Sequence, residues 1–129
     1  MTDEEKDALK ITLFPIFLGN TYTSRRFAKR LFFRTGISSL ICDNKRAVSD
    51  LFSISYRFCH IYKSLDDRIL SEQLLSLAQK YSELTLLLIP ANKDYSRAVD
   101  RLTPLLEPRF IITDTDNLFV CPPIADMLA

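Results

Sequence analysis

Short apolar runs alternate along the chain with segments in which apolar residues recur at helical spacing. The apolar runs predict five short buried strands, at residues 11–18, 37–42, 57–61, 84–89 and 109–113. The segments between them predict helices, at residues 23–35, 47–54, 64–81 and 95–105. Because the runs are apolar throughout, they favour parallel strands that are covered on both faces. The pattern therefore predicts an α/β fold, a three-layer doubly wound sandwich of about five mostly parallel strands with a Rossmann-like topology.

Proline, glycine and serine residues indicate where these elements begin, bend or end. Pro15 falls inside the first run, where proline cannot donate to a central ladder, so this strand is expected to bulge there or to begin after it. Gly36 is expected to stop the first helix. Ser64 and Asp67 have the spacing of a capping box and predict the start of the third helix. Pro104 is expected to break or restart the last turn of the fourth helix.

Length and charge narrow the class of protein. The chain has 129 residues, which fits one domain, expected at residues 11–114 between an N-terminal extension (1–10) and a C-terminal tail (115–129). The net charge of +1 gives no electrostatic argument for a nucleic-acid or anionic-membrane partner. No apolar run approaches the roughly 20 residues that span a bilayer, and the first ten residues, in which acidic side chains outnumber basic ones, do not form a cationic leader. We therefore expect no membrane partner and a cytoplasmic protein.

Rare residue types exclude several kinds of chemistry. Two glycines cannot form a dinucleotide fingerprint or a Walker A loop. His60 and the three cysteines, Cys42, Cys59 and Cys121, lack the paired spacings of zinc sites, so no metal site is expected. Three cysteines also argue against a secreted disulfide framework. His60 has no evident nucleophile and orienting acid, so no catalytic residue is assigned.

A candidate site lies where the predicted strands end. Open parallel sheets bind ligands at the carboxyl ends of their strands, at the point where the winding reverses. The turn after the first strand offers Gly19, Asn20 and Thr21, and the amides of a helix N-terminus there suit a carboxylate or phosphate. In the alternative interpretation Gly19 makes a turn while Thr21 or Thr23 caps the helix, and residue types alone favour capping. Asn92 has the same two interpretations, as a ligand contact or as a helix cap.

Two further polar features have both a functional and a structural interpretation. Asp43 lies where a dinucleotide fold places its ribose-binding acid, but without the glycine fingerprint a solvated loop acid is favoured. Basic residues of the first helix could face a polyanion, although the neutral chain favours a solvated helix face. These basic residues are Arg25, Arg26, Lys29, Arg30 and Arg34.

Three segments, in this order, resemble the pre-ATP-grasp domain of ATP-grasp carboxylate–amine ligases. Residues 15–31 (PIFLGNTYTSRRFAKRL) are similar to its opening strand, turn and helix. Residues 86–95 (LLLIPANKDY) are similar to its fourth strand and the turn that follows. Residues 105–112 (LLEPRFII) are similar to its last helix end and fifth strand. The likeness extends over residues 11–114, and the chain is similar to D-aspartate ligase and carbamoyl-phosphate-synthase-like proteins.

The resemblance implies a ligase in which ATP and magnesium phosphorylate an acid and an amine attacks the acyl phosphate. Most of that chemistry belongs to an ATP-grasp domain that follows, which this chain, ending at Ala129, does not contain. The chain alone is therefore expected to be non-catalytic and to hold no cofactor. Its expected partners are the ATP-grasp domain of the same full-length protein, if it is truncated, and a carboxylate or amino-acid substrate. The substrate-binding residues that the resemblance implies are Gly19, Asn20, Thr21, Asn92 and Asp94.

Two other functions remain open from the sequence. A flavodoxin-like domain would bind flavin mononucleotide (FMN) through Gly19-Asn20-Thr21, which is similar to the phosphate loop of that family. However, Phe17 and Leu18 replace the hydroxyl residues expected before that loop, and no glycine-rich flavin-ring loop follows. An interaction module would instead dock its apolar tail, residues 118–128, on a partner or on a second copy to give a homodimer.

Overall fold

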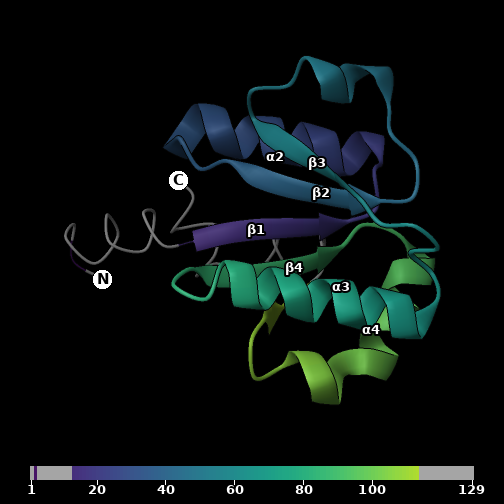
Figure 1. Ribbon diagram of the computed structural model, residues 1–129. Helices are drawn as coiled ribbons and strands as arrows, with labels where there is room; N and C mark the ends of the chain where they lie inside the picture. Colours follow the sequence, from purple (N-terminus) through teal and green to yellow (C-terminus); the bar gives the residue numbers. More distant parts are fainter. Residues whose placement is uncertain (1, 3–12, 114–129) are drawn as a thin grey trace.

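The structure, a computed structural model, describes residue 2 and residues 13–113 (Figure 1). Apart from residue 2, the expected extension lies outside these residues, as do the tail and Cys121. In chain order, the elements are β1 (Leu13–Leu18), α2 (Tyr22–Thr35), β2 (Ser39–Asp43), the 3-10 helix η1 (Val48–Leu51), β3 (Tyr56–His60), α3 (Asp67–Lys80), β4 (Thr85–Pro90), α4 (Lys93–Leu106) and β5 (Ile111–Ile112). Every predicted strand and helix is present, with ends shifted by a few residues.

The strands form one five-stranded sheet in the order β3-β2-β1-β4-β5, and every pair in it is parallel. Helix α2 lies on one face of the sheet, and α3 and α4 lie on the other (Figure 1). The predicted three-layer, doubly wound α/β sandwich is therefore confirmed. The order differs from the 2-1-3-4-5 order of flavodoxin-like folds, so the topology does not favour the FMN-binding alternative.

Two apolar layers hold the sandwich together, one on each face of the sheet. Residues alternate between faces along a strand, so β1 contributes Phe17 to the α2 side and Ile16 and Leu18 to the α3 and α4 side. All three side chains are fully buried. On the second side, Leu74 of α3 and Val99 of α4 complete the layer. Burying both faces of β1 explains why its sequence is apolar without alternation.

Pro15 lies within the central strand β1 without a bulge, because the β1–β2 hydrogen-bond ladder begins at the residue after it. Gly19, just after β1, donates its N–H to the Cys42 carbonyl of β2. Backbone nitrogens alternate in direction along a strand, so the nitrogens of Phe17 and Pro15 also point toward β2. The β1–β2 pairing starts only at Ile16. The missing N–H of Pro15 therefore removes no ladder bond from the β1–β2 pair.

The helix ends agree in part with the sequence signals. Gly36 ends α2 in a left-handed conformation with φ of 76°, as predicted. The N-cap of α3 is Asp66 and not Ser64. The Asp66 carboxylate accepts from the backbone amides of Arg68 and Ile69, whereas the Ser64 side chain is buried and does not cap the helix. The prediction that Pro104 interrupts the last helix was also wrong, since α4 continues through it to Leu106. Pro104 removes only its own N–H bond, and the Glu107 N–H still donates to the Thr103 carbonyl across it.

Candidate functional site

The order of the strands reverses at β1, which places the turns after β1 and β4 side by side. Ala91, just after β4, donates its N–H to the Leu18 carbonyl over 2.8 Å. Gly19 has φ of +116° and packs so closely that an added Cβ would lie 3.2 Å from the Ala91 Cβ and 3.4 Å from the Asn92 Nδ2. The structure thus brings together the two turns that contain the predicted binding residues.

Thr21 and Asn92 both cap helices, as the capping interpretation predicted. The Thr21 Oγ1 accepts from the Ser24 N–H over 3.0 Å, and the Thr21 N–H donates back to the Ser24 Oγ over 3.0 Å. Ser24 is buried and also donates to the Gly19 carbonyl over 2.8 Å. The Asn92 Oδ1 accepts from the Tyr95 N–H over 2.9 Å. Among the described residues the Asn92 Nδ2 has no hydrogen-bond acceptor, so its amino group is left to donate.

Asn20 is held by protein groups on three sides. Its N–H donates to the Asp43 Oδ2 over 2.6 Å, and its Nδ2 donates to the Asp50 Oδ2 over 2.7 Å. Its Oδ1 accepts from the Arg25 Nη1 over 2.7 Å. Asn20 therefore ties the turn after β1 to the end of β2, to η1 and to the start of α2.

Asp43 is the centre of this hydrogen-bond network. Besides the Asn20 N–H, its carboxylate accepts from the Asn44 N–H and from the Tyr95 hydroxyl, each at a distance of 2.7 Å. Tyr95 is buried in α4, and burial raises the pKa of its hydroxyl, which is therefore protonated and able to donate at neutral pH. The buried Ser64 hydroxyl is hydrogen-bonded to the same Tyr95 oxygen. A carboxylate of the protein itself thus accepts from the Asn20 backbone amide, in the turn where a ligand anion was expected.

A second carboxylate, Asp50 of η1, organises the loop between β2 and β3. It accepts from the Ala47 N–H over 2.7 Å and from the Tyr56 hydroxyl. Burial, followed by this bond to Asp50, raises the pKa of Tyr56. Sequence analysis predicted no hydrogen bonds for Asp50, Tyr56 or Tyr95 and expected Ser64 only to cap a helix, because these contacts join separate elements.

What remains free at this edge lies mainly at the start of α4. Asp94 is exposed in the first helical turn. The amides of Lys93 and Asp94 precede the capped Tyr95 amide and have no partner within the helix. Together with the Asn92 amino group, they can donate to a carboxylate, and Asp94 can accept from an ammonium group. The described residues hold no group of three histidine, cysteine or acidic side chains that could hold a metal ion.

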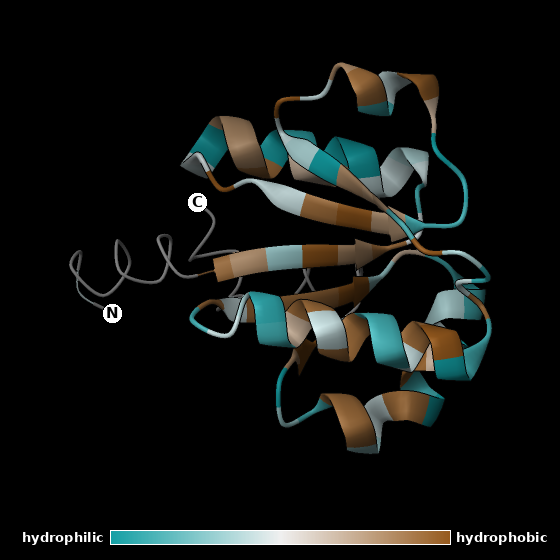
Figure 2. Cartoon of the chain, in the orientation of Figure 1, coloured by the Kyte–Doolittle hydropathy of each residue, from teal (hydrophilic) through white to brown (hydrophobic). Residues whose placement is uncertain are grey.

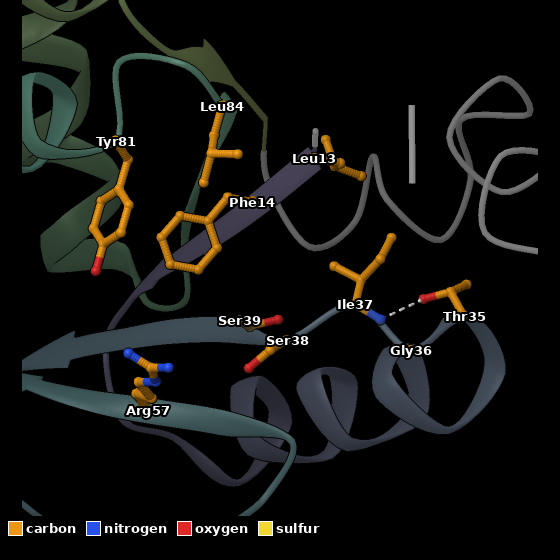
Figure 3. A pocket seen from close by; sticks show the side chains of 10 residues that line it. All are labelled: Leu13, Phe14, Thr35, Gly36, Ile37, Ser38, Ser39, Arg57, Tyr81 and Leu84. Carbon is orange, nitrogen blue, oxygen red and sulfur yellow. Dashed lines mark hydrogen bonds between the residues drawn. The ribbon is translucent and has the colours of Figure 1, made fainter. Parts of the chain in front are cut away.

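A cavity of about 510 Å³ lies at the opposite, amino-terminal edge of the strands (Figure 3). Apolar side chains dominate one wall, where Phe14 and Tyr81 are in edge-to-face contact with ring centroids 4.8 Å apart. Arg57 of β3 and Ser39 of β2 border the other wall. The buried Ser39 Oγ has no hydrogen-bond partner in the part of the chain that the structure describes.

A larger groove, of about 940 Å³, runs between α2 and the segment from η1 to β3. Apolar side chains are unusually exposed there, with Phe52 80% and Ile54 71% accessible. Figure 2 shows this apolar stretch around η1, away from the core. Three cations of α2 border the same groove: Arg25, Arg26 and Lys29. Part of the basic face predicted from the sequence therefore adjoins apolar surface.

These features define a doubly wound, Rossmann-like α/β domain with a polar edge at its strand reversal. Comparison with protein-family models, curated proteins and solved structures found no match to the chain. No helix among the described residues has the length and apolar character needed to cross a membrane.

Proposed function

We propose that this domain is the substrate-side, N-terminal domain of an ATP-grasp carboxylate–amine ligase and that its edge beside Asn92 contacts an amino-acid substrate. The observation that carries the proposal is the close packing of the turns after β1 and β4, where Ala91 donates its N–H to the Leu18 carbonyl and an added Gly19 Cβ would lie 3.4 Å from the Asn92 Nδ2. The resemblance assigns these two turns to substrate. Ligands of open parallel sheets bind at such a reversal of strand order. ATP and magnesium would be held by a separate ATP-grasp domain.

The free groups of this edge match the two charges of an amino acid. The amides of Lys93 and Asp94 and the Asn92 amino group supply donors for a carboxylate. The exposed Asp94 carboxylate supplies an acceptor for an ammonium group, in the same helical turn. Asn20 and Thr21 act differently in this proposal, since their polar groups fix the turn and do not contact the substrate directly.

Replacing Asn92 with aspartate separates capping from binding. Aspartate caps a helix as well as asparagine does, so Asn92→Asp is expected to keep the free energy of unfolding within about 0.5 kcal/mol of that of the natural chain. It places a negative charge where the substrate carboxylate would lie, so binding is expected to weaken about tenfold or more. Binding of a panel of D- and L-amino acids is followed by the shifts of the backbone amide signals of residues 19–21 and 92–95.

Asn92→Ser is the matched control, because serine retains the cap without a charge. It removes the amino donor but leaves the two backbone amides, so its affinity is expected to lie between those of the natural chain and Asn92→Asp. ATP with magnesium is expected to leave the melting temperature of this chain unchanged, since the proposed nucleotide site lies in another domain. The proposal is overturned if no amino acid moves these signals at millimolar concentration, or if Asn92→Asp binds as tightly as the natural chain.

A second candidate function is docking of an acidic, amphipathic peptide in the groove beside α2. The exposed Phe52 and Ile54 offer apolar contacts, and Arg26 and Lys29 offer complementary positive charge. Exposed apolar surface rimmed by polar groups is typical of interaction sites. The chain is neutral overall, so a short acidic peptide fits this local charge better than an extended polyanion does.

We expect a labelled amphipathic peptide of glutamate and leucine to bind this groove. The same peptide with lysine in place of glutamate is expected not to bind. Arg26→Glu is expected to weaken the binding about tenfold, whereas Arg30→Glu, on the same helix but outside the groove, is expected to change it less than twofold. Fluorescence polarisation measures both. Equal loss in the two variants, or tighter binding of single-stranded RNA than of the peptide, would count against this function.

A further inference from the structure

Two cysteines face each other across the strands β2 and β3. Cys42 and Cys59 are register partners in this parallel pair. Neighbouring strands lie about 4.8 Å apart, which falls within the range of roughly 4.4–6.8 Å between the Cα atoms of a disulfide. Register partners also project to the same face of a sheet, and both cysteines pack in the apolar layer under α3 and α4. The backbone therefore places the two Cα atoms at a separation that a disulfide can span.

The two thiols differ in burial and in charge. Cys42 is fully buried, whereas Cys59 is only partly buried. Hydrogen bonding with Cys42, aided by the charge of Lys80, lowers the pKa of Cys59 to about 7. The same bond, together with burial, raises the pKa of Cys42. Cys59 is thus the more accessible and more ionised sulfur, which is the character of a reactive cysteine.

We propose that Cys42 and Cys59 form a peroxide-reactive thiol pair, in which Cys59 is oxidised first and Cys42 resolves it to an intramolecular disulfide between β2 and β3. This inference does not depend on the proposed ligase function. The paired strands supply the geometry, and the unequal burial of the sulfurs assigns the two roles.

The reaction balances with hydrogen peroxide as the oxidant. The Cys59 thiolate attacks one peroxide oxygen, the O–O bond breaks, and the products are a sulfenic acid and hydroxide, which takes up a proton to become water. The Cys42 sulfur then attacks the Cys59 sulfur, the S–O bond breaks, and the departing hydroxide takes the Cys42 proton as a second water. Two thiols and one peroxide thus give one disulfide and two waters.

Peptide mapping after peroxide treatment tests the proposal directly. Trypsin places the three cysteines in different peptides, residues 35–45, 58–63 and 110–129. We expect residues 35–45 and 58–63 to become linked, to separate again with dithiothreitol, and the peptide of Cys121 to remain alkylatable. A link that involves Cys121, a link between two chains, or full alkylation of both cysteines after treatment overturns the proposal.

Two variants assign the roles of the sulfurs. Cys42→Ala is expected to stop the reaction at a Cys59 sulfenic acid, which dimedone traps, while Cys121→Ser is expected to leave the link unchanged. A further readout needs no variant: alkylation of Cys59 by iodoacetamide is expected to reach half its maximal rate near pH 7. A midpoint near the ordinary cysteine value of about 8.5 would contradict the assigned roles.

Discussion

Replacing Gly19 with alanine is expected to destabilise the domain by about 2–5 kcal/mol, whereas the same change at Gly36 should cost about 1–2 kcal/mol. Both glycines have positive φ, +116° at Gly19 and +76° at Gly36, so backbone strain contributes to both changes. They differ in their surroundings. A Cβ at Gly19 would meet Ala91, Tyr95 and Asn92 within 3.4 Å, whereas a Cβ at Gly36 meets nothing within 4 Å.

The pair of variants therefore isolates the close approach of the two turns at the strand reversal. Neighbours of Gly19 come from the start of α4, and Tyr95 is buried, so they can move little to accept a methyl group. Urea unfolding of both variants beside the natural chain measures the difference. If Gly19→Ala costs no more than Gly36→Ala, the turns are less tightly packed than described, and the proposed binding edge loses its main support.

Local signals in the sequence were sufficient for most of the fold. Each predicted strand is present because burial on both faces of a parallel sheet requires apolar runs, and such runs are visible without any partner. Thr21 and Asn92 were favoured as caps for a similar reason, since a cap bonds only two or three residues along its own chain. The Ser64 prediction failed because Asp66 offers a competing cap within the same turn.

Contacts between distant segments could not be predicted in this way. Asp43 bonds the Tyr95 hydroxyl, 52 residues away, only because the strand order brings the end of β2 near the start of α4. The pairing of Cys42 with Cys59 likewise depends on the register of two strands. The residues of the candidate edge were therefore identifiable by their position after strands, but their roles depended on which groups the fold places against them.

Replacing Asp43 with alanine is expected to cost about 2–4 kcal/mol, because it leaves the Asn20 N–H and the buried Tyr95 hydroxyl without their acceptor. Hydrogen bonds to a charged group contribute roughly 1.5–3 kcal/mol each, and the partial exposure of Asp43 reduces that figure. Tyr95→Phe is expected to cost about 1–2 kcal/mol, since it removes one donor and keeps the ring in the core.

A double-mutant cycle distinguishes a connected network from two independent contacts. In the Asp43→Ala background, Tyr95→Phe should cost about 1 kcal/mol less than in the natural chain, because its acceptor is already gone. Urea unfolding of the four proteins at pH 7 gives this coupling. A coupling near zero would mean that water replaces the carboxylate without loss. The Asp43 network would then no longer explain how the turns after β1, β2 and β4 are held in one arrangement.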